Sequence, residues 1–475
     1  MKVDFIEPQD PRWSGLLERV DHDLYHLPEY VSIAAEHEGG EPIAVTVTDG
    51  ESTLLLPLVV RPIPNVGASR LSGYFDAVAP YGYPHPLVVT GKGAEGDAFL
   101  RRALAELPAA LSQRRIVAAF VRLHPLLPFP VEEAAVIGPV VDHGETVAID
   151  LTGNPQTLLS QMRVNHVRWI NKGLKAGHEV TVTDSTVDLA EFVDIYTESM
   201  AYVDASPYYF FSSDYFEALM RRLPGIVHLA FLEIDRQKAC AVMIGEVDGI
   251  VEYHLGGTRS AFRRQSPMVL LTYEVARWAQ SRGNKVLHLG GGVGGCADSL
   301  FHFKAGFSSA RHPFRTWRII ADPQIYGELT RLWEEQAGRP ADPPTDFFPA
   351  YRKHPPVRAS TGRQEGRIYG PGGALIPGEK PLVIVGAGGQ GREILKALVE
   401  RGEGGPIAGF VDESALLRDL LVDGKPVLGS LSWLVGHSTE YRAIVAIEDE
   451  AKRRETVDRL RRAGVQSAPG VGRRP

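Results

Sequence analysis

Residues 286–307 read VLHLGGGVGGCADSLFHFKAGF and join an apolar, strand-like start to a dense glycine cluster. Glycine allows positive φ angles and lets the backbone approach a ligand closely. Lys304 follows among aromatic residues, where a desolvated cation could hold a phosphate or a developing oxyanion. The pattern therefore indicates a ligand-binding turn or, about as readily, an ordinary glycine-rich loop with a surface lysine.

The segments before this stretch alternate between strands and helices. In the second half, hydrophobic periodicity predicts helices at 155–176, 189–200 and 267–282, and strands at 179–182, 228–234, 239–246, 250–255 and 286–289. In the first half it predicts a strand hairpin, a helix and a strand, at 43–47 with 52–60, 98–114 and 116–121. The similar order predicts one mixed α/β and α+β fold used twice.

A proline- and glycine-rich segment at 337–379 interrupts this periodicity and is typical of a linker. It predicts an acetyltransferase-like domain at 1–145, a second at 146–336, and a small Rossmann-like parallel α/β domain at 380–475. A chain of 475 residues is long enough for about three domains.

Composition narrows the class of protein. The net charge of −7 and the pI of about 6.1 argue against a global attraction to DNA. The two cysteines, Cys240 and Cys296, form no disulfide framework, which favours a reducing, cytoplasmic location. We expect neither a signal peptide nor an integral membrane segment, and we expect no metal site because no zinc-ligand spacing is present.

The order of hairpin, strand, loop, helix and strand in the second half is that of an acetyltransferase-like fold. In acyl-CoA enzymes of that fold, the loop before the helix offers amide groups to a pyrophosphate. Arg263 and Arg264 lie in this loop, and Ser266 and Pro267 suit the N-cap and the first helical position. Ser266 and Pro267 also fill places where acyl-CoA enzymes have glycine.

Residues 1–335 resemble the Fem-type family, whose members have paired acetyltransferase-like domains. The matching motifs are R-x4-R-x3-K at 163–172, YHLGGT at 253–258, RRQSP at 263–267 and residues 289–307. The resemblance implies an enzyme that joins an acyl or aminoacyl group, often from charged tRNA, to an amine of a nucleotide-linked cell-surface precursor. The acceptor would lie between the two domains.

The resemblance also implies roles for single residues. Lys304 would stabilise negative charge at the reacting centre. Asp298 and His302 are candidate bases, although Asp298 could equally cap the following helix. The one-turn spacing of Arg168 and Lys172 would suit acceptor phosphates or a solvated helix face opposite Leu158, Met162, Trp169 and Leu174.

In the first half, the resemblance places acceptor-binding groups in the segment that contains Asp76, Tyr81 and Tyr83. Aromatic residues beside proline and glycine are also common in simple packing, so that role stays open.

The C-terminal body opens with an apolar strand and the sequence GAGGQGRE at 386–393. This Gly-x-Gly-x-x-Gly motif between strand and helix predicts a nucleotide site. Its residues are Gly386, Gly388, Gly389, Gly391 and Arg392, with Asp412 after the next strand as a partner for a ribose hydroxyl.

Residues 380–469 closely resemble the N-terminal domain of PglD/NeuD-type sugar acyltransferases, which implies binding of a nucleotide-linked amino sugar. Relatives usually have histidine at the position of Gln390. They also continue into a left-handed β-helix that carries the catalytic histidine and the acetyl-CoA site, and this sequence shows no such repeats.

Together these features predict an acyl- or aminoacyltransferase that acts on an amine of a nucleotide-activated amino sugar or related glycan precursor. We expect no tightly bound cofactor, and the donor is left open between aminoacyl-tRNA and acyl-CoA. The alternatives are a non-catalytic nucleotide-sugar-binding scaffold and an NAD(P)-dependent oxidoreductase, for which the C-terminal domain is small. The oligomeric state is not predicted.

Overall fold

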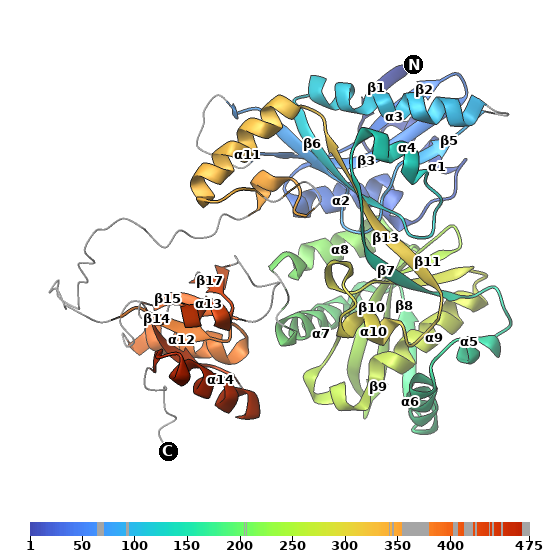
Figure 1. The fold of residues 1–475 in the computed structure, drawn as a ribbon. Helices are drawn as coiled ribbons and strands as arrows, with labels where there is room; N and C mark the ends of the chain where they lie inside the picture. Colours follow the sequence, from blue (N-terminus) through green and yellow to red (C-terminus); the bar gives the residue numbers. More distant parts are fainter. Residues whose placement is uncertain are drawn as a thin grey trace. The chain divides into compact units, whose positions relative to one another are not determined.

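The computed structural model describes residues 1–353 apart from 64–70, 92–94, 204, 206, 342, 344 and 345. It also describes 380–467 apart from 402–406, 413–420, 423–424, 437, 439–440 and 448–449. The chain forms two compact units (Figure 1). Unit 1 comprises Met1–Met200, Phe210–Arg331 and Asp342–Arg352, and unit 2 comprises Ala201–Tyr209, Leu332–Ala341 and Lys353–Pro475.

The described strands of unit 1 share one mixed sheet in the order β1-β2-β3-β4-β6-β13-β7-β12-β11-β10-β9-β8, with β5 paired to β3. Their bounds are β1 Lys2–Ile6, β2 Glu41–Asp49, β3 Ser52–Pro62, β4 Phe75–Val78, β5 Leu87–Val89, β6 Ile116–Leu123, β7 Val140–Asp150, β8 Glu179–Thr183, β9 Val227–Ile234, β10 Gln237–Val247, β11 Ile250–Thr258, β12 Val286–Gly290 and β13 Arg311–Ile320.

Helices cover both faces of this sheet. They are α1 Pro11–Leu17, α2 Pro28–Glu38, α3 Glu95–Gln113, α4 Val131–Ile137, α5 Thr157–Ser160, α6 Val164–Lys175, α7 Leu189–Tyr202, α8 Ser213–Arg222, α9 Pro267–Ser281, α10 Ser299–Lys304 and α11 Pro323–Ala337. Short 3₁₀ turns include η1 Leu24–His26 and η5 Ser260–Gln265. The mixed α/β class predicted from the sequence is confirmed.

Two long strands join the halves of unit 1. β7 pairs with β13 through its first residues and with β12 through its last, so it crosses from one half to the other. β13 then pairs with β6 and buries Trp317 and Ile319 in the core of the first half. Strand pairing therefore returns residues 311–320 to the first half, while the domain boundary at 146 stays a prediction.

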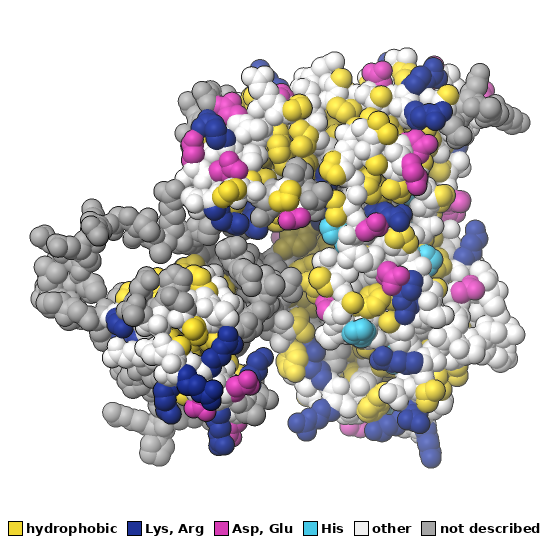
Figure 2. Space-filling view, in the orientation of Figure 1, with side chains coloured by type: hydrophobic (Ala, Val, Ile, Leu, Met, Phe, Trp, Pro, Cys, Tyr) yellow, Lys and Arg dark blue, Asp and Glu magenta, His cyan; other side chains and the backbone are white. Residues whose placement is uncertain are grey.

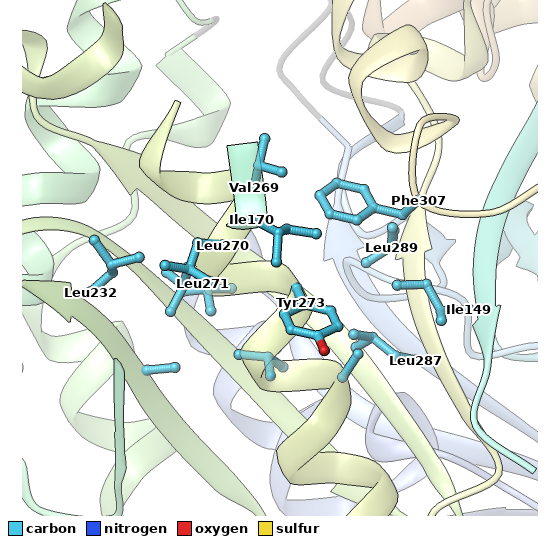
Figure 3. Close-up of a cluster of buried hydrophobic side chains, with 14 of the residues drawn as sticks. Ile149, Ile170, Leu232, Val269, Leu270, Leu271, Tyr273, Leu287, Leu289 and Phe307 are labelled. Atoms are coloured by element: carbon cyan, nitrogen blue, oxygen red, sulfur yellow. The ribbon is translucent and has the colours of Figure 1, made fainter. Parts of the chain in front are cut away.

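The second half packs around a core between the sheet and helices α6 and α9 (Figure 3). Ile170 of α6 and Leu270 of α9 meet Leu287 and Leu289 of β12, and Phe307 closes the cluster after α10. Side chains of a strand alternate between faces, so His288, which lies between these two leucines, points to the opposite face of the sheet.

Three local expectations are wrong. The helix expected at 155–176 is broken before α6, because the Arg163 amide donates to the Gly306 carbonyl over 2.9 Å and Arg163 is extended. Leu174 is exposed, and Gly173 takes the buried position beside it. Ser266 precedes α9 at φ 49° and makes no side-chain cap, although Pro267 begins the helix as predicted.

Unit 2 contains a six-stranded sheet in the order β16-β17-β15-β14-β18-β19 among its described residues. The strands are β14 Leu382–Val385, β15 Ile407–Val411, β16 Leu421–Val422, β17 Lys425–Gly429, β18 Arg442–Val445 and β19 Gln466–Ser467, with helices α12 Gly389–Arg401, α13 Leu431–Gly436 and α14 Glu450–Arg462. β14 pairs in parallel with β15 on one side and β18 on the other. The strand order reverses at β14, and ligands of open α/β sheets bind at such a switch point.

Candidate functional site

The candidate site lies where β11 and β12 separate. These strands pair in parallel over only three positions, which end at Glu252 opposite His288. Beyond this point β11 stays with β10 and bulges at His254, while β12 ends at Gly290 beside β7. We call the strand ends beyond Glu252 and His288 the fork.

The glycine cluster folds α10 back onto the fork. Asp298 caps α10 by accepting from the amides of Phe301 and Val293 over 2.8 and 3.0 Å. Lys304, at the end of α10, donates from Nζ to the Gly291 carbonyl over 2.8 Å. A Cβ atom at Gly290 would lie 3.4 Å from both Lys304 Nζ and the Tyr83 hydroxyl. The lysine, the tyrosine and the strand end therefore meet at one point.

Burial lowers the pKa of Lys304 to about 8, against the opposing effect of the Asp298 and Glu252 carboxylates. The ammonium is thus close to losing its proton in the physiological range. A group with this pKa is cationic below pH 8 and neutral above it.

This pKa predicts an alkaline loss of activity. If the Lys304 cation stabilises the transition state, kcat should fall as the pH rises through about 8, because the neutral amine holds negative charge poorly. In Lys304→Arg, the guanidinium stays charged and the alkaline fall should disappear from whatever activity remains. A pH profile of kcat checks this, and an identical alkaline limb in both proteins would contradict it.

A buried Glu252–His288 pair lies beside the lysine. His288 Nδ1 lies 2.9 and 3.0 Å from the two Glu252 oxygens, and both side chains are almost fully buried. His288 Nε2 is buried without a hydrogen-bond partner among the described residues. Burial alone would raise the pKa of Glu252, but His288 and His124 outweigh it and lower that pKa.

The first half completes this polar cluster with His124 and Asp23. His124 Nε2 lies 2.9 Å from Asp23 Oδ2 and 3.7 Å from Glu252 Oε1. Asp23 Oδ1 lies 2.6 Å from His26 Nδ1. Burial would raise the pKa of Asp23, yet the two histidines hold it below its usual value. The cluster therefore joins η1 and the end of β6 to the fork.

Asp23, His124 and Glu252 offer three ligand atoms within 4.8 Å of one another. The ring of His124 does not fit a cation there. Its Nδ1 accepts from the amides of Leu126 and Leu127 over 3.0 and 3.1 Å, so the ring proton lies on Nε2. A protonated nitrogen has no lone pair for a metal, and the trio is better described as a hydrogen-bonded cluster.

Tyr81 and Tyr83 reach the fork from the loop between β4 and β5. The Tyr83 ring packs edge-on against His288, with centroids 5.3 Å apart, and Tyr81 packs against His254 at 5.5 Å. His254 lies between the hydroxyls of Tyr25 and Tyr215, and burial lowers its pKa to about 4. The aromatic segment indicated by the family resemblance thus contacts the fork.

Other predicted residues lie elsewhere or are already engaged. Asp76 is fully buried and pairs with Arg61 over 3.1 Å and with Arg352, so it forms an ion-pair network away from the fork. His302 is exposed. Both oxygens of Asp298 accept amide hydrogen bonds, which gives it the capping role that the sequence left open.

Arg168 and Lys172 lie on the exposed face of α6, where Lys172 rests over Trp169 at 4.8 Å. Figure 2 shows basic side chains gathered over this end of unit 1. The two residues therefore form a surface stripe apart from the buried fork, and phosphate binding there stays a prediction.

The loop before α9 is occupied by side chains of α7. Glu198 accepts from the Ser260 amide over 2.6 Å and from Arg259 over 3.3 Å, and Arg263 donates to Ser199 over 3.0 Å. Arg264 is exposed. A carboxylate at this position would repel a pyrophosphate.

In unit 2 the glycine motif forms a tight strand-to-helix turn. Gly386 has φ 104° and donates to the Val411 carbonyl over 2.8 Å. Asp412 Oδ2 accepts from the Ala387 amide over 2.8 Å, so at least one of its oxygens orders the loop. Gly388 has open space where a side chain would project. Helix α12 begins at the next residue, Gly389, and includes Arg392. The turn therefore places backbone groups at the point where the strand order of the sheet reverses.

Two glycines of this motif should respond differently to alanine. A Cβ atom at Gly391 would overlap the Gly386 carbonyl oxygen, whereas one at Gly388 meets nothing within 4 Å. Gly391→Ala should cost about 1–3 kcal/mol and accelerate hydrogen exchange over β14 and α12 of the intact chain. Gly388→Ala should leave hydrogen exchange in both elements unchanged. Equal exchange in the two variants would contradict this packing account.

The sequence missed Glu252, His288, His124 and Asp23 as a group. The four residues lie in separate segments, and only strand pairing and the return of the first half bring them together. The weak signal available was polar residues inside apolar strands, as in the sequence VLHL at 286–289.

Comparison with known proteins supports both units. Residues 160–304 match the Acetyltransferase (GNAT) domain family, and residues 381–460 match the PglD N-terminal domain family. No curated protein sequence matches the chain significantly. No described helix is long and apolar enough to cross a membrane.

Solved structures resemble unit 1. The crystal structure of FemX covers 69% of this chain and 99% of its own length at 11% identity, with a TM-score of 0.54. The structure of L-PGS from Bacillus licheniformis covers 69% of this chain and 97% of its own length at 14% identity, with a TM-score of 0.42. The likeness to FemX confirms the paired-domain fold that the sequence predicted.

Proposed function

We propose that this acyltransferase, which has paired acetyltransferase-like domains of Fem-type fold joined to a PglD N-terminal domain, acts on an amine of a nucleotide-activated amino sugar. The acyl or aminoacyl group is transferred at the fork, and the C-terminal domain captures the nucleotide part of a sugar substrate. The observation that carries the proposal is the half-buried Lys304 at the fork, with Tyr83 at the same strand end.

Amide formation at the fork needs a positive group near the carbonyl oxygen. The acceptor nitrogen attacks the acyl carbon, a C–N bond forms, and the carbonyl oxygen becomes an oxyanion. Lys304 Nζ would donate to that oxygen, since it is a half-buried cation that donates to the backbone carbonyl of Gly291 beside the strand end. The donor's ester or thioester bond then breaks, and the leaving oxygen or sulfur takes up a proton.

For the donor, the loop before α9 favours an aminoacyl ester over acyl-CoA. Glu198 accepts from the Ser260 amide and from Arg259, so a carboxylate occupies the loop that would bind a coenzyme A pyrophosphate. Aminoacyl-tRNA presents no pyrophosphate at this position, so the same carboxylate would not exclude it. We therefore place aminoacyl-tRNA first and acyl-CoA second as donor.

Ligand-induced thermal shifts of the intact chain separate this proposal from the oxidoreductase alternative. The ligands are UDP-, GDP-, CDP- and dTDP-linked amino sugars, acetyl-CoA and NAD(H). The proposal expects one amino-sugar nucleotide to raise the melting temperature and expects Gly388→Ala to abolish that rise. A shift with NAD(H) alone would instead favour an oxidoreductase.

A further inference from the structure

The Glu252–His288 pair has the arrangement of a catalytic base and its orienting carboxylate. His288 Nδ1 faces both Glu252 oxygens, at 2.9 and 3.0 Å, so the ring proton belongs on Nδ1. Nε2 then carries the lone pair. That atom is buried and has no partner among the described residues, and an unsatisfied buried acceptor is costly unless a ligand or a reaction uses it.

The place of His288 in the fold agrees with such a use. His288 is the last residue of β12 that pairs with β11, two residues before Gly290. Tyr83 packs on its ring, and the Tyr83 hydroxyl shares the strand end with Lys304 Nζ. Tyr83 thus contacts His288 through its ring, while its hydroxyl lies at the same strand end as Lys304 Nζ.

Two side chains of the first half, His124 and Asp23, lie next to Glu252. His124 Nε2 lies 3.7 Å from Glu252 Oε1 and 2.9 Å from Asp23 Oδ2. The Glu252 carboxylate therefore lies on the Nδ1 side of the His288 ring, and Asp23 holds the His124 ring beside that carboxylate. Such charges orient an imidazole and stabilise the imidazolium that forms when it accepts a proton.

From this geometry we propose that His288 is the general base of the transfer reaction and that Glu252 is its positioning residue. The inference rests on the proposed function. After the amine attacks, Nε2 of His288 takes the proton from the new C–N nitrogen. It then gives this proton to the leaving oxygen as the donor's ester bond breaks, so the base is restored and no further reactant is needed.

Several titratable side chains lie around His288. They are Glu252 from β11, His124 after β6, Tyr83 from the loop before β5 and His312 from β13. The alkaline limb of the pH profile is assigned to Lys304.

The test compares wild type with His288→Gln, Glu252→Gln and His228→Gln, using the donor and amino-sugar nucleotide that give the fastest wild-type turnover. His228 is a matched control, because it is a buried histidine of the same sheet that pairs with Asp184 and Glu246. We expect kcat to fall about 10²- to 10⁴-fold in His288→Gln and about 10- to 100-fold in Glu252→Gln, with KM little changed. His228→Gln should keep wild-type kcat.

A further readout separates catalysis from folding. ¹⁵N-histidine NMR of the intact protein should show His288 as the Nδ1–H tautomer, and Glu252→Gln should alter that signal. If wild type turns over and His288→Gln keeps more than one third of the wild-type kcat, the role proposed for His288 is wrong, while the proposed function stands. If wild type shows no turnover with any combination of donor and amino-sugar nucleotide, the proposed function and this role are both wrong.

Discussion

Replacing Lys304 by alanine is expected to lower kcat about 10²- to 10³-fold, the usual effect of removing one oxyanion donor from a preorganised site. The ammonium is held by the Gly291 carbonyl at the end of α10, so it needs no reorganisation when charge develops nearby. The nucleotide-sugar binding that we propose for residues 380–467 should be unchanged, since that domain has its own core.

The matched control for this variant is Lys285→Ala. Lys285 is an exposed lysine immediately before β12, at the opposite end of that strand from the fork. It should keep wild-type kcat. Steady-state rates of transfer for the two variants, with nucleotide binding measured by calorimetry, give the comparison. An unchanged kcat in Lys304→Ala would remove this lysine from the mechanism.

Replacing Asp23 by alanine is expected to destabilise unit 1 by about 3–5 kcal/mol, the usual cost of breaking a buried charged pair. Asp23 is fully buried and holds both His26 and His124, so its loss leaves two buried ring nitrogens without their partner. Hydrogen exchange of peptides from β6 and β12 in the intact chain should accelerate about 100-fold or more.

Asp10→Ala is the control for that stability change. Asp10 also pairs with a basic side chain, Arg12, but lies near the surface. Water screens such a pair, so exchange in β6 and β12 should stay close to wild type. If Asp23→Ala were as stable as Asp10→Ala, the buried cluster would not hold the halves together as described.

The sequence was informative where a local pattern determines structure. The hairpin across residues 49–52, helix α9 after Pro267 and the turn at 386–391 all follow from apolar spacing and from glycine or proline. The same is true of the short glycine cluster that brings Lys304 toward a strand end. These are contacts between residues close in the chain.

The sequence could not reveal contacts made by distant segments. Glu252 and His288 become neighbours through strand register, while Asp23 and His124 reach them across the junction of the halves. Asp76 was expected at the acceptor, but Arg61 and Arg352, the latter 276 residues away, neutralise it. The break before α6 likewise depends on a hydrogen bond to Gly306.

The central claim is that the fork joins an acyl group to the amine of a nucleotide-activated sugar. The direct measurement is mass spectrometry of UDP-, GDP-, CDP- and dTDP-amino sugars after incubation with the intact chain and either acetyl-CoA or total tRNA charged with labelled amino acids. The account predicts an N-acylated or N-aminoacylated sugar nucleotide with wild type and almost none with Lys304→Ala. A nucleotide that binds but gains no mass with any donor would contradict it and indicate a non-catalytic scaffold.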